Sequence, residues 1–120
     1  PDTLSGGQCK RICIARAVAS KPEILICDEP LSYLVSELHV QITELLYSLT
    51  KRYSMSLIFI THNIDYLRYI CDEILVLENG KIVELDNART VLESPQSDCA
   101  KRMTAENEFL KNCISKTEKE

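Results

Sequence analysis

The hydrophobic residues of this chain follow two different spacings, which together predict alternating strands and helices. Two short aliphatic runs, "EILICDEP" at residues 23–30 and "SLIFITHN" at residues 56–63, predict strands that are buried on both faces and are therefore parallel. Between them, apolar residues recur at helical spacing, at Leu38, Ile42, Leu45, Leu46 and Leu49. This order of strand, helix and strand predicts an α/β sheet of parallel strands with right-handed crossover helices.

Capping and turn residues predict the elements on either side of this unit. Ser5 is suited to cap a helix that ends near Ala19, before a Lys-Pro pair. Asn79 and Gly80, inside the apolar run of residues 73–85, are typical of a β-hairpin. The remaining expected elements are a short helix at about 64–71, a helix from Asn87 to Glu93, a polar helical tail at about 97–112 and a frayed end at 115–120.

Polar residues follow both predicted strands at the point where each strand ends. Asp28 and Glu29 end the first strand, and Thr61 and His62 end the second. Because the carboxyl ends of parallel strands meet at one edge of a sheet, we expect these four residues to converge there. One carboxylate in that position can hold Mg²⁺ through water, and a second can orient or deprotonate an attacking water. An acid pair of this kind, taken alone, is more often a helix cap than a functional site.

A second candidate site stands at the start of the first helix. Ser5, Gly6 and Gly7 supply a hydroxyl and backbone N–H groups at a helix N-terminus, which attract phosphate. His62 can donate to a phosphoryl oxygen or help to hold a water. His39, in contrast, falls on a predicted helix, and we expect it to be solvated without a specific role.

The composition narrows the possible classes of protein. The chain has 120 residues, of which 45% are hydrophobic and 27% are charged, as in ordinary globular domains. The net charge of −4 argues against nucleic acid as a partner. The apolar runs are too short to cross a membrane, no signal peptide is seen, and a start at Pro1 suggests a cut chain. The six cysteines match no zinc spacing, and we expect reduced thiols, several of them in the core.

Three motifs in order, "LSGGQ", "ILICDEP" and "IFITHN", resemble those of the ATP-binding subunits of ABC transporters. The resemblance covers nearly the whole chain. "RYICDEILVLENGKIVEL" and "VLESPQ" are most similar to the oligopeptide, dipeptide and nickel importers. The resemblance implies that residues 1–95 are the C-terminal part of an ABC ATP-binding domain and that residues 96–120 are a helical extension. It also implies a partial P-loop NTPase sheet, ATP and Mg²⁺ as cofactors, and a role in energising the import of peptides or nickel.

The same resemblance implies a role for each motif residue. Asp28 would hold Mg²⁺ through water, Glu29 would be the catalytic base, and His62 would be the switch histidine on the chain's own nucleotide. Ser5, Gly6, Gly7 and Gln8 would contact ATP held by a second ABC ATPase subunit, in a head-to-tail homodimer or heterodimer. The other partners would be membrane permease subunits, which place the protein at the cytoplasmic face of the cell membrane.

One family motif is missing from the sequence. No G-x-x-x-x-G-K-[ST] phosphate loop is present, so we expect this loop upstream of Pro1 and expect the chain alone to be inactive. The strand that carries the loop would lie beside residues 57–60, which are therefore expected to have an empty edge. A non-transport ABC ATPase and an inactive truncated remnant stay open as alternatives.

Two segments depart from the family pattern. Val35 stands where the resemblance implies an aspartate that crosses the dimer interface, and Tyr33 stands where it implies an alanine. These changes are either drift or the mark of an asymmetric pair with one weakened site. Residues 97–99 stand where the importer subfamily tends to have His-Pro-Tyr, which leaves the solute open.

Overall fold

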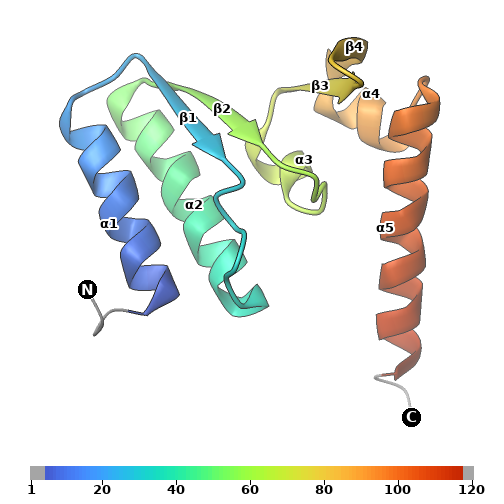
Figure 1. Ribbon diagram of the computed structural model, residues 1–120, viewed down its shortest axis with the longest axis horizontal. Helices are drawn as coiled ribbons and strands as arrows, with labels where there is room; N and C mark the ends of the chain where they lie inside the picture. Colours follow the sequence, from blue (N-terminus) through green and yellow to red (C-terminus); the bar gives the residue numbers. More distant parts are fainter. Residues whose placement is uncertain (1–4, 118–120) are drawn as a thin grey trace. The chain divides into compact units, whose positions relative to one another are not determined.

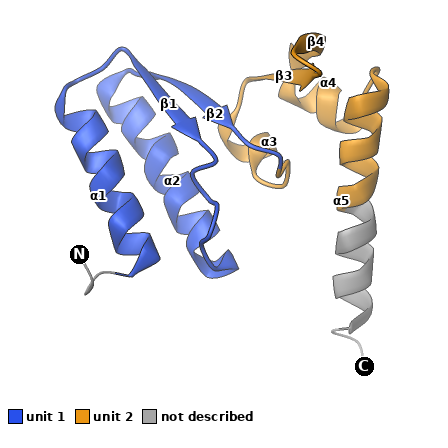
Figure 2. Cartoon of the chain, viewed as in Figure 1, with its two compact units in different colours: residues 1–62 blue, residues 63–120 orange. Residues whose placement is uncertain are grey.

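The computed structural model describes the backbone of residues 5–117 and the side chains of residues 5–107. The chain divides into two compact units, residues 1–62 and residues 63–120 (Figure 2). The first unit contains α1 (Gly6–Ala19), β1 (Ile24–Asp28), α2 (Ser36–Tyr53) and β2 (Ser56–Ile60). The second contains α3 (Leu67–Ile70), β3 (Glu73–Glu78), β4 (Lys81–Asn87), α4 (Ala88–Glu93) and α5 (Asp98–Thr117) (Figure 1). The predicted domain boundary after residue 95 falls inside the second unit, between α4 and α5.

The first unit is a β-α-β crossover with one further helix beside it. β1 and β2 pair in parallel, from Ile24 opposite Ser56 to Asp28 opposite Ile60. The connecting helix α2 packs beside α1, and a hydrogen bond of 2.7 Å from Arg11 to Gln41 joins the two helices. The predicted apolar stripe of α2 is confirmed, since Ile42 and Leu46 are fully buried. The fold class predicted from the sequence, α/β with parallel strands and a crossover helix, is therefore confirmed.

The prediction that both faces of this sheet are buried is wrong for the described chain. Leu25 and Cys27 are buried on one face, whereas Ile24, Ile26, Ile58 and Ile60 are between 47% and 63% exposed. Burial on both faces requires a covering layer on each side of the sheet. Within residues 5–62, α1 and α2 supply a layer on one side (Figure 1). The aliphatic sequences of β1 and β2 therefore suit strands that are buried on both faces, but the described chain covers only one face of the sheet.

The expected open edge of β2 is confirmed within the described residues. β2 pairs with β1, and the described part of the chain adds no further strand to this sheet. An aliphatic strand whose edge is unpaired offers free N–H and C=O groups to another chain. The isoleucine face, defined here as Ile24, Ile26, Ile58 and Ile60, adds exposed apolar area beside that edge.

The two helices of the first unit begin in different ways. The N-cap of α1 is Ser5, as predicted, and it forms a capping box with Gln8. The N-cap of α2 is Val35, whose side chain accepts no hydrogen bond from the helix. An aliphatic N-cap leaves amide groups of the first turn without the acceptor that a serine or aspartate would supply.

The second unit is built on the predicted hairpin. β3 and β4 pair antiparallel, with a register irregularity after Val76, and Asn79 and Gly80 take φ values of 51° and 75° in the turn. These left-handed values suit asparagine and glycine, which explains the Asn-Gly signal. Asn87 caps α4, because its Oδ1 accepts the N–H of Thr90 at 2.9 Å.

The hairpin also holds the start of α5. The carboxylate of Glu84 accepts hydrogen bonds from the backbone N–H of Gln96 and from the hydroxyl of Ser97. Arg102 forms an ion pair with Glu78, one turn further along the helix. The predicted helical tail is therefore present, although it extends through Ser115–Thr117, where fraying was expected. Residues 118–120 lie outside the described part, and the short helix predicted at 64–71 is limited to Leu67–Ile70.

None of the helices in the described part of the chain is both long and apolar enough to span a membrane.

We expect the isoleucine face to drive self-association of the 120-residue chain. The double substitution Ile26→Thr and Ile58→Thr should lower the average mass measured by light scattering, because it removes exposed apolar area while keeping β-branched side chains. Tyr47→Thr is the matched control, since Tyr47 is 44% exposed but lies on α2. Equal association of the double variant and the parent chain would contradict this assignment.

We expect Val35→Asp to stabilise the protein by roughly 0.5–2 kcal/mol, the usual contribution of an N-cap acceptor. Val35 is exposed, so little burial is lost when it is replaced. Urea unfolding of the two forms gives the difference in free energy. Val35→Ala is the control, because alanine is also a poor N-cap and should leave stability nearly unchanged. An aspartate variant no more stable than the alanine variant would show that the first turn of α2 needs no cap.

Candidate functional site

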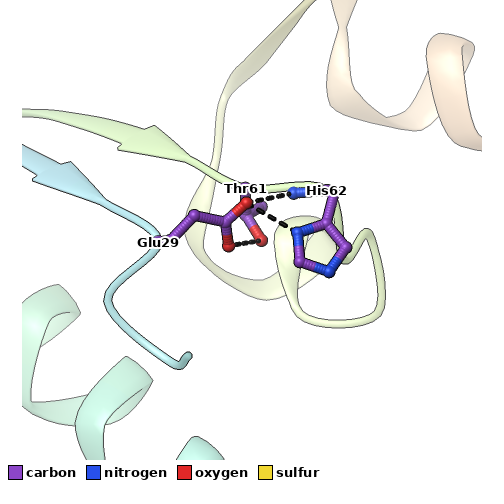
Figure 3. A network of polar contacts seen from close by, with 3 residues as sticks. All are labelled: Glu29, Thr61 and His62. Atoms are coloured by element: carbon purple, nitrogen blue, oxygen red, sulfur yellow. Dashed lines mark hydrogen bonds and ion pairs between the residues drawn. The ribbon is translucent and has the colours of Figure 1, made fainter. Parts of the chain in front are cut away.

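The sheet brings three of the predicted site residues together at its carboxyl edge. Glu29 directly follows β1, and Thr61 and His62 directly follow β2. The backbone N–H of Glu29 donates to the carbonyl of Ile60 at 2.8 Å, which continues the strand pairing by one residue. The side chain of Glu29 therefore meets those of Thr61 and His62, as Figure 3 shows, although Glu29 precedes them by more than thirty positions in the sequence.

The carboxylate of Glu29 accepts hydrogen bonds on both oxygens. Its Oε1 accepts the backbone N–H of His62 at 3.0 Å and lies 2.6 Å from Nδ1 of the same residue. Its Oε2 accepts the hydroxyl of Thr61 at 3.3 Å (Figure 3). Since a carboxylate only accepts, the Nδ1 atom of His62 carries the hydrogen in this contact. The two strand ends thereby fix the direction in which Glu29 presents its charge.

The same contacts set the protonation of Glu29. Partial burial raises the pKa of its carboxyl group, but the hydrogen bonds and charge of His62 and the hydroxyl of Thr61 together lower that pKa below its ordinary value. Glu29 is consequently an anion at neutral pH. The ring of His62 is 84% exposed, so it faces solvent on the side away from Glu29.

The backbone at Glu29 is bent into an unusual conformation. Its φ is 47°, in the left-handed region that residues with a Cβ rarely adopt. This conformation costs about 1–2 kcal/mol for a residue other than glycine. The bend turns the chain sharply away from β1, and the Glu29 carbonyl then accepts the N–H of Ser32 at 3.1 Å. Strain of this size at a strand end is common where a side chain has a function.

Asp28 is the last residue of β1, opposite Ile60, and its side chain is exposed. Within the part of the chain that the structure describes, no three His, Cys, Asp or Glu side chains form a group that could hold a metal ion. An exposed carboxylate such as that of Asp28 can contact a hydrated cation through the cation's own water. Asp28 supplies one hard oxygen donor of the kind that Mg²⁺ prefers.

The first turn of α1 contains the second group of predicted residues. Oγ of Ser5 accepts the N–H of Gln8 at 3.2 Å, and Oε1 of Gln8 accepts the N–H of Ser5 at 2.9 Å. The side chains of Ser5 and Gln8 thus have a structural role as a capping box. The N–H groups of Gly6 and Gly7 have no acceptor within the helix, and the turn contains no acidic residue. This turn can accept an anion.

Both glycines of this turn permit close packing. A Cβ atom on Gly7, which is buried, would lie 2.9 Å from Cδ1 of Leu38. A Cβ atom on Gly6 would lie 3.3 Å from Cδ2 of Leu34. The first turn of α1 therefore rests on the segment that precedes and begins α2. Close packing against Leu34 and Leu38 is therefore one reason for glycine at positions 6 and 7, whether or not the turn binds a ligand.

The expectation that His39 is solvated without a specific role is wrong. His39 is partly buried, and its Nε2 lies 3.0 Å from the carbonyl oxygen of Leu34. Helical side chains point back toward the N-terminus, so a residue in the first turn of α2 can reach a carbonyl that precedes the helix. The sequence gives no periodic signal for such a contact.

The described cysteines agree with the core interpretation in part. Cys27 is buried, and burial raises the pKa of its thiol, an effect that Lys10 partly offsets. Burial, together with the charge of Asp72, raises the pKa of Cys71 to about 11. These two thiols are protonated at neutral pH and unreactive. Cys9, Cys13 and Cys99 are also free, and the side chain of Cys113 lies outside the described residues.

Comparison with known proteins identifies the class to which this geometry corresponds. Residues 1–32 match the family model described as "ABC transporter". The fold is similar to cbiO1 from Clostridium perfringens, part of the ABC transporter complex cbiONQ, with a TM-score of 0.72 and 32% identity over 78% of this chain and 37% of that one. It is also similar to the ADP conformation of MJ1267, an ATP-binding cassette of an ABC transporter, with a TM-score of 0.69 and 28% identity over 78% and 38%.

Curated relatives give the same class. The chain is 41% identical over 107 residues to the methionine import ATP-binding protein MetN of Staphylococcus saprophyticus, covering 89% of this chain and 31% of that protein. It is 40% identical over 123 residues to MetN 3 of Bacillus cereus, covering 97% and 36%. The chain is thus homologous to part of the ATP-binding domain of ABC transporters, and it spans about a third of the length of these relatives. They are named for methionine import, so the predicted likeness to peptide and nickel importers is not supported.

We expect Gly7→Ala to be less stable than Gly6→Ala by about 1 kcal/mol or more, in the range of overpacked cores. Both substitutions gain the same helix propensity, so the difference isolates the contact of the new methyl group with Leu38 or Leu34. Thermal unfolding of the two variants measures it. Equal stability would mean that Leu38 moves aside at no cost.

Proposed function

We propose that this chain forms part of the ATP-hydrolysing subunit of an ABC importer. The observation that carries the proposal is the cluster of Glu29, Thr61 and His62 at the carboxyl edge of a parallel sheet. An exposed aspartate, Asp28, directly precedes Glu29 in the chain. The homology to import ATP-binding proteins supports the assignment of ATP as the substrate. In this proposal residues 1–95 belong to the ATP-binding domain, and residues 96–120 form a helical extension of it.

On the chain's own nucleotide, three residues have separate roles. Glu29 is the base: its oriented carboxylate accepts a proton from the water that attacks the γ-phosphorus. His62 donates the hydrogen on its Nδ1 to Glu29, and because its ring is exposed it can turn and donate that hydrogen to a phosphoryl oxygen instead. Asp28 would hold Mg²⁺ through water, and this ion offsets the charge of the phosphates when it is bound.

The first turn of α1 serves a different nucleotide in this proposal. The N–H groups of Gly6 and Gly7 donate to the γ-phosphate of ATP on a second ABC ATPase subunit, in a head-to-tail pair. Ser5 and Gln8 contribute by holding the turn in helical geometry through their capping box. The side chains of Ser5 and Gln8 can reach that phosphate only if the hydrogen bonds of the capping box break.

The relatives described above support a proposal for the partners and the solute. We propose that membrane permease subunits are further partners and that the protein lies at the cytoplasmic face of the membrane. We propose no nucleic-acid partner. Methionine is the solute that we propose, because the relatives described above are named for methionine import. This replaces the peptides or nickel expected from the sequence.

In the full-length protein that contains this chain, assembled with its partners, Glu29→Gln should lower ATP turnover about 100- to 10,000-fold, the usual effect of removing a general base. ATP binding should be retained, because the amide keeps the size of the side chain. His62→Ala should also lower turnover strongly, since it removes the donor that orients Glu29. Phosphate release and nucleotide titration measure the two quantities.

Glu44→Gln is the matched control, because it makes the same chemical change at an exposed position on α2. Turnover of Glu29→Gln close to that of the wild type would exclude Glu29 as the base. Absence of turnover in the wild-type assembly would instead favour an inactive remnant.

A further inference from the structure

The segment from Glu29 to Val35, here called the connecting loop, joins the two candidate sites of this chain. It begins at the carboxylate that contacts His62 and ends at the N-cap of α2. Leu34 in this loop lies beneath Gly6, and Leu38 just beyond it lies beneath Gly7. A displacement of the connecting loop therefore moves the surface on which the first turn of α1 rests.

The connecting loop is anchored near its start by Leu31, which is buried, and the residues that follow Leu31 are held by local interactions. Glu29 and Tyr33 both have left-handed φ values, 47° and 63°, and the Tyr33 side chain is exposed to solvent. Two turn bonds close the loop locally, from Ser32 N–H to Glu29 and from Leu34 N–H to Leu31, at 3.1 and 3.3 Å. Val35 supplies no side-chain cap where the loop meets α2. A bond from outside the loop therefore helps to fix the part of the loop that follows Leu31.

His39 makes such a bond. Its Nε2 lies 3.0 Å from the carbonyl oxygen of Leu34. A backbone carbonyl only accepts, so Nε2 carries the hydrogen and donates it. The acceptor belongs to the residue whose side chain supports Gly6. This contact thus ties helix α2 to Leu34, whose side chain lies beneath Gly6.

We propose that His39 is a positioning residue that fixes the connecting loop, and through Leu34 the phosphate-facing turn of α1, relative to Glu29. The inference rests on the proposed function for its effect on catalysis. The positioning itself is a property of the fold and is tested separately below. The contact that carries the proposal is the one between Nε2 of His39 and the carbonyl of Leu34 in the connecting loop.

The test compares His39→Leu with His39→Gln in the full-length protein that contains this chain. Leucine removes the donor, whereas the amide nitrogen of glutamine stands four bonds from Cα, as Nε2 of histidine does. Both residues favour helix more than histidine does, so neither weakens α2 through its propensity. Val40→Leu, at the neighbouring exposed position, is the matched control.

Hydrogen exchange tests the positioning without any nucleotide. His39→Leu should raise the exchange rates of the amides at residues 32–38 by roughly 2- to 10-fold, as expected for one lost hydrogen bond. His39→Gln and Val40→Leu should leave these rates near those of the wild type. Unchanged protection in His39→Leu, or equal loss in His39→Gln, would overturn the proposal.

Steady-state kinetics of the assembled transporter tests the effect on catalysis. His39→Leu should lower kcat by roughly the same 2- to 10-fold while the KM for ATP stays constant, because the loop aligns groups without binding the chain's own nucleotide. His39→Gln should restore kcat. A raised KM with unchanged kcat would overturn the catalytic part. If the wild-type assembly hydrolyses no ATP, the proposed function fails, and the exchange comparison still decides whether His39 positions the loop.

Discussion

The parallel pairing of β1 with β2 is the constraint on which the candidate site depends. One hydrogen bond beyond the strands, from Glu29 N–H to the Ile60 carbonyl, aligns the residues that follow them. A shift of the register by one residue would turn Glu29 toward the opposite face of the sheet and separate it from His62. The buried residues Ile42 and Leu46 of α2 hold the crossover in place and so maintain that register. The geometry of the candidate site therefore depends directly on the packing of the core in this unit.

The contacts of Glu29 impose opposite demands on one carboxylate. Hydrogen bonds from His62 and Thr61 fix its orientation but also lower its pKa, which makes it a weaker base. An oriented anion is useful if the donors weaken their hold as water and phosphate enter. The exposed ring of His62 allows this, because it can turn toward a phosphoryl oxygen without disturbing the core. The resting geometry thus favours correct orientation over basicity.

Much of this arrangement could be predicted from the sequence because it depends on local chemistry and on topology. Apolar periodicity located α2, Ser5 and Asn87 located helix starts, and parallel topology placed Glu29 beside His62. The exposure of Ile24 and Ile26 could not be predicted. An aliphatic run shows that a strand suits a buried sheet, but it does not show whether this chain supplies a layer to cover the face opposite α1 and α2. The contact of His39 with Leu34 was missed for a different reason. It joins a side chain to a backbone carbonyl across a helix start, and no repeat in the sequence marks it.

The two departures from the family pattern acquire a physical meaning from the fold. Val35 occupies the N-cap of α2, so the aspartate expected there would have capped the helix as well as faced a partner. With valine, the start of α2 loses that acceptor, and Tyr33 keeps an exposed aromatic ring in a left-handed conformation. The bond from His39 to the Leu34 carbonyl lies at the same helix start and restrains the same loop. In this chain the acceptor at the N-cap is absent, and a donor, Nε2 of His39, restrains the connecting loop through the Leu34 carbonyl. The stability of the loop therefore does not depend on the side chain that would face a partner.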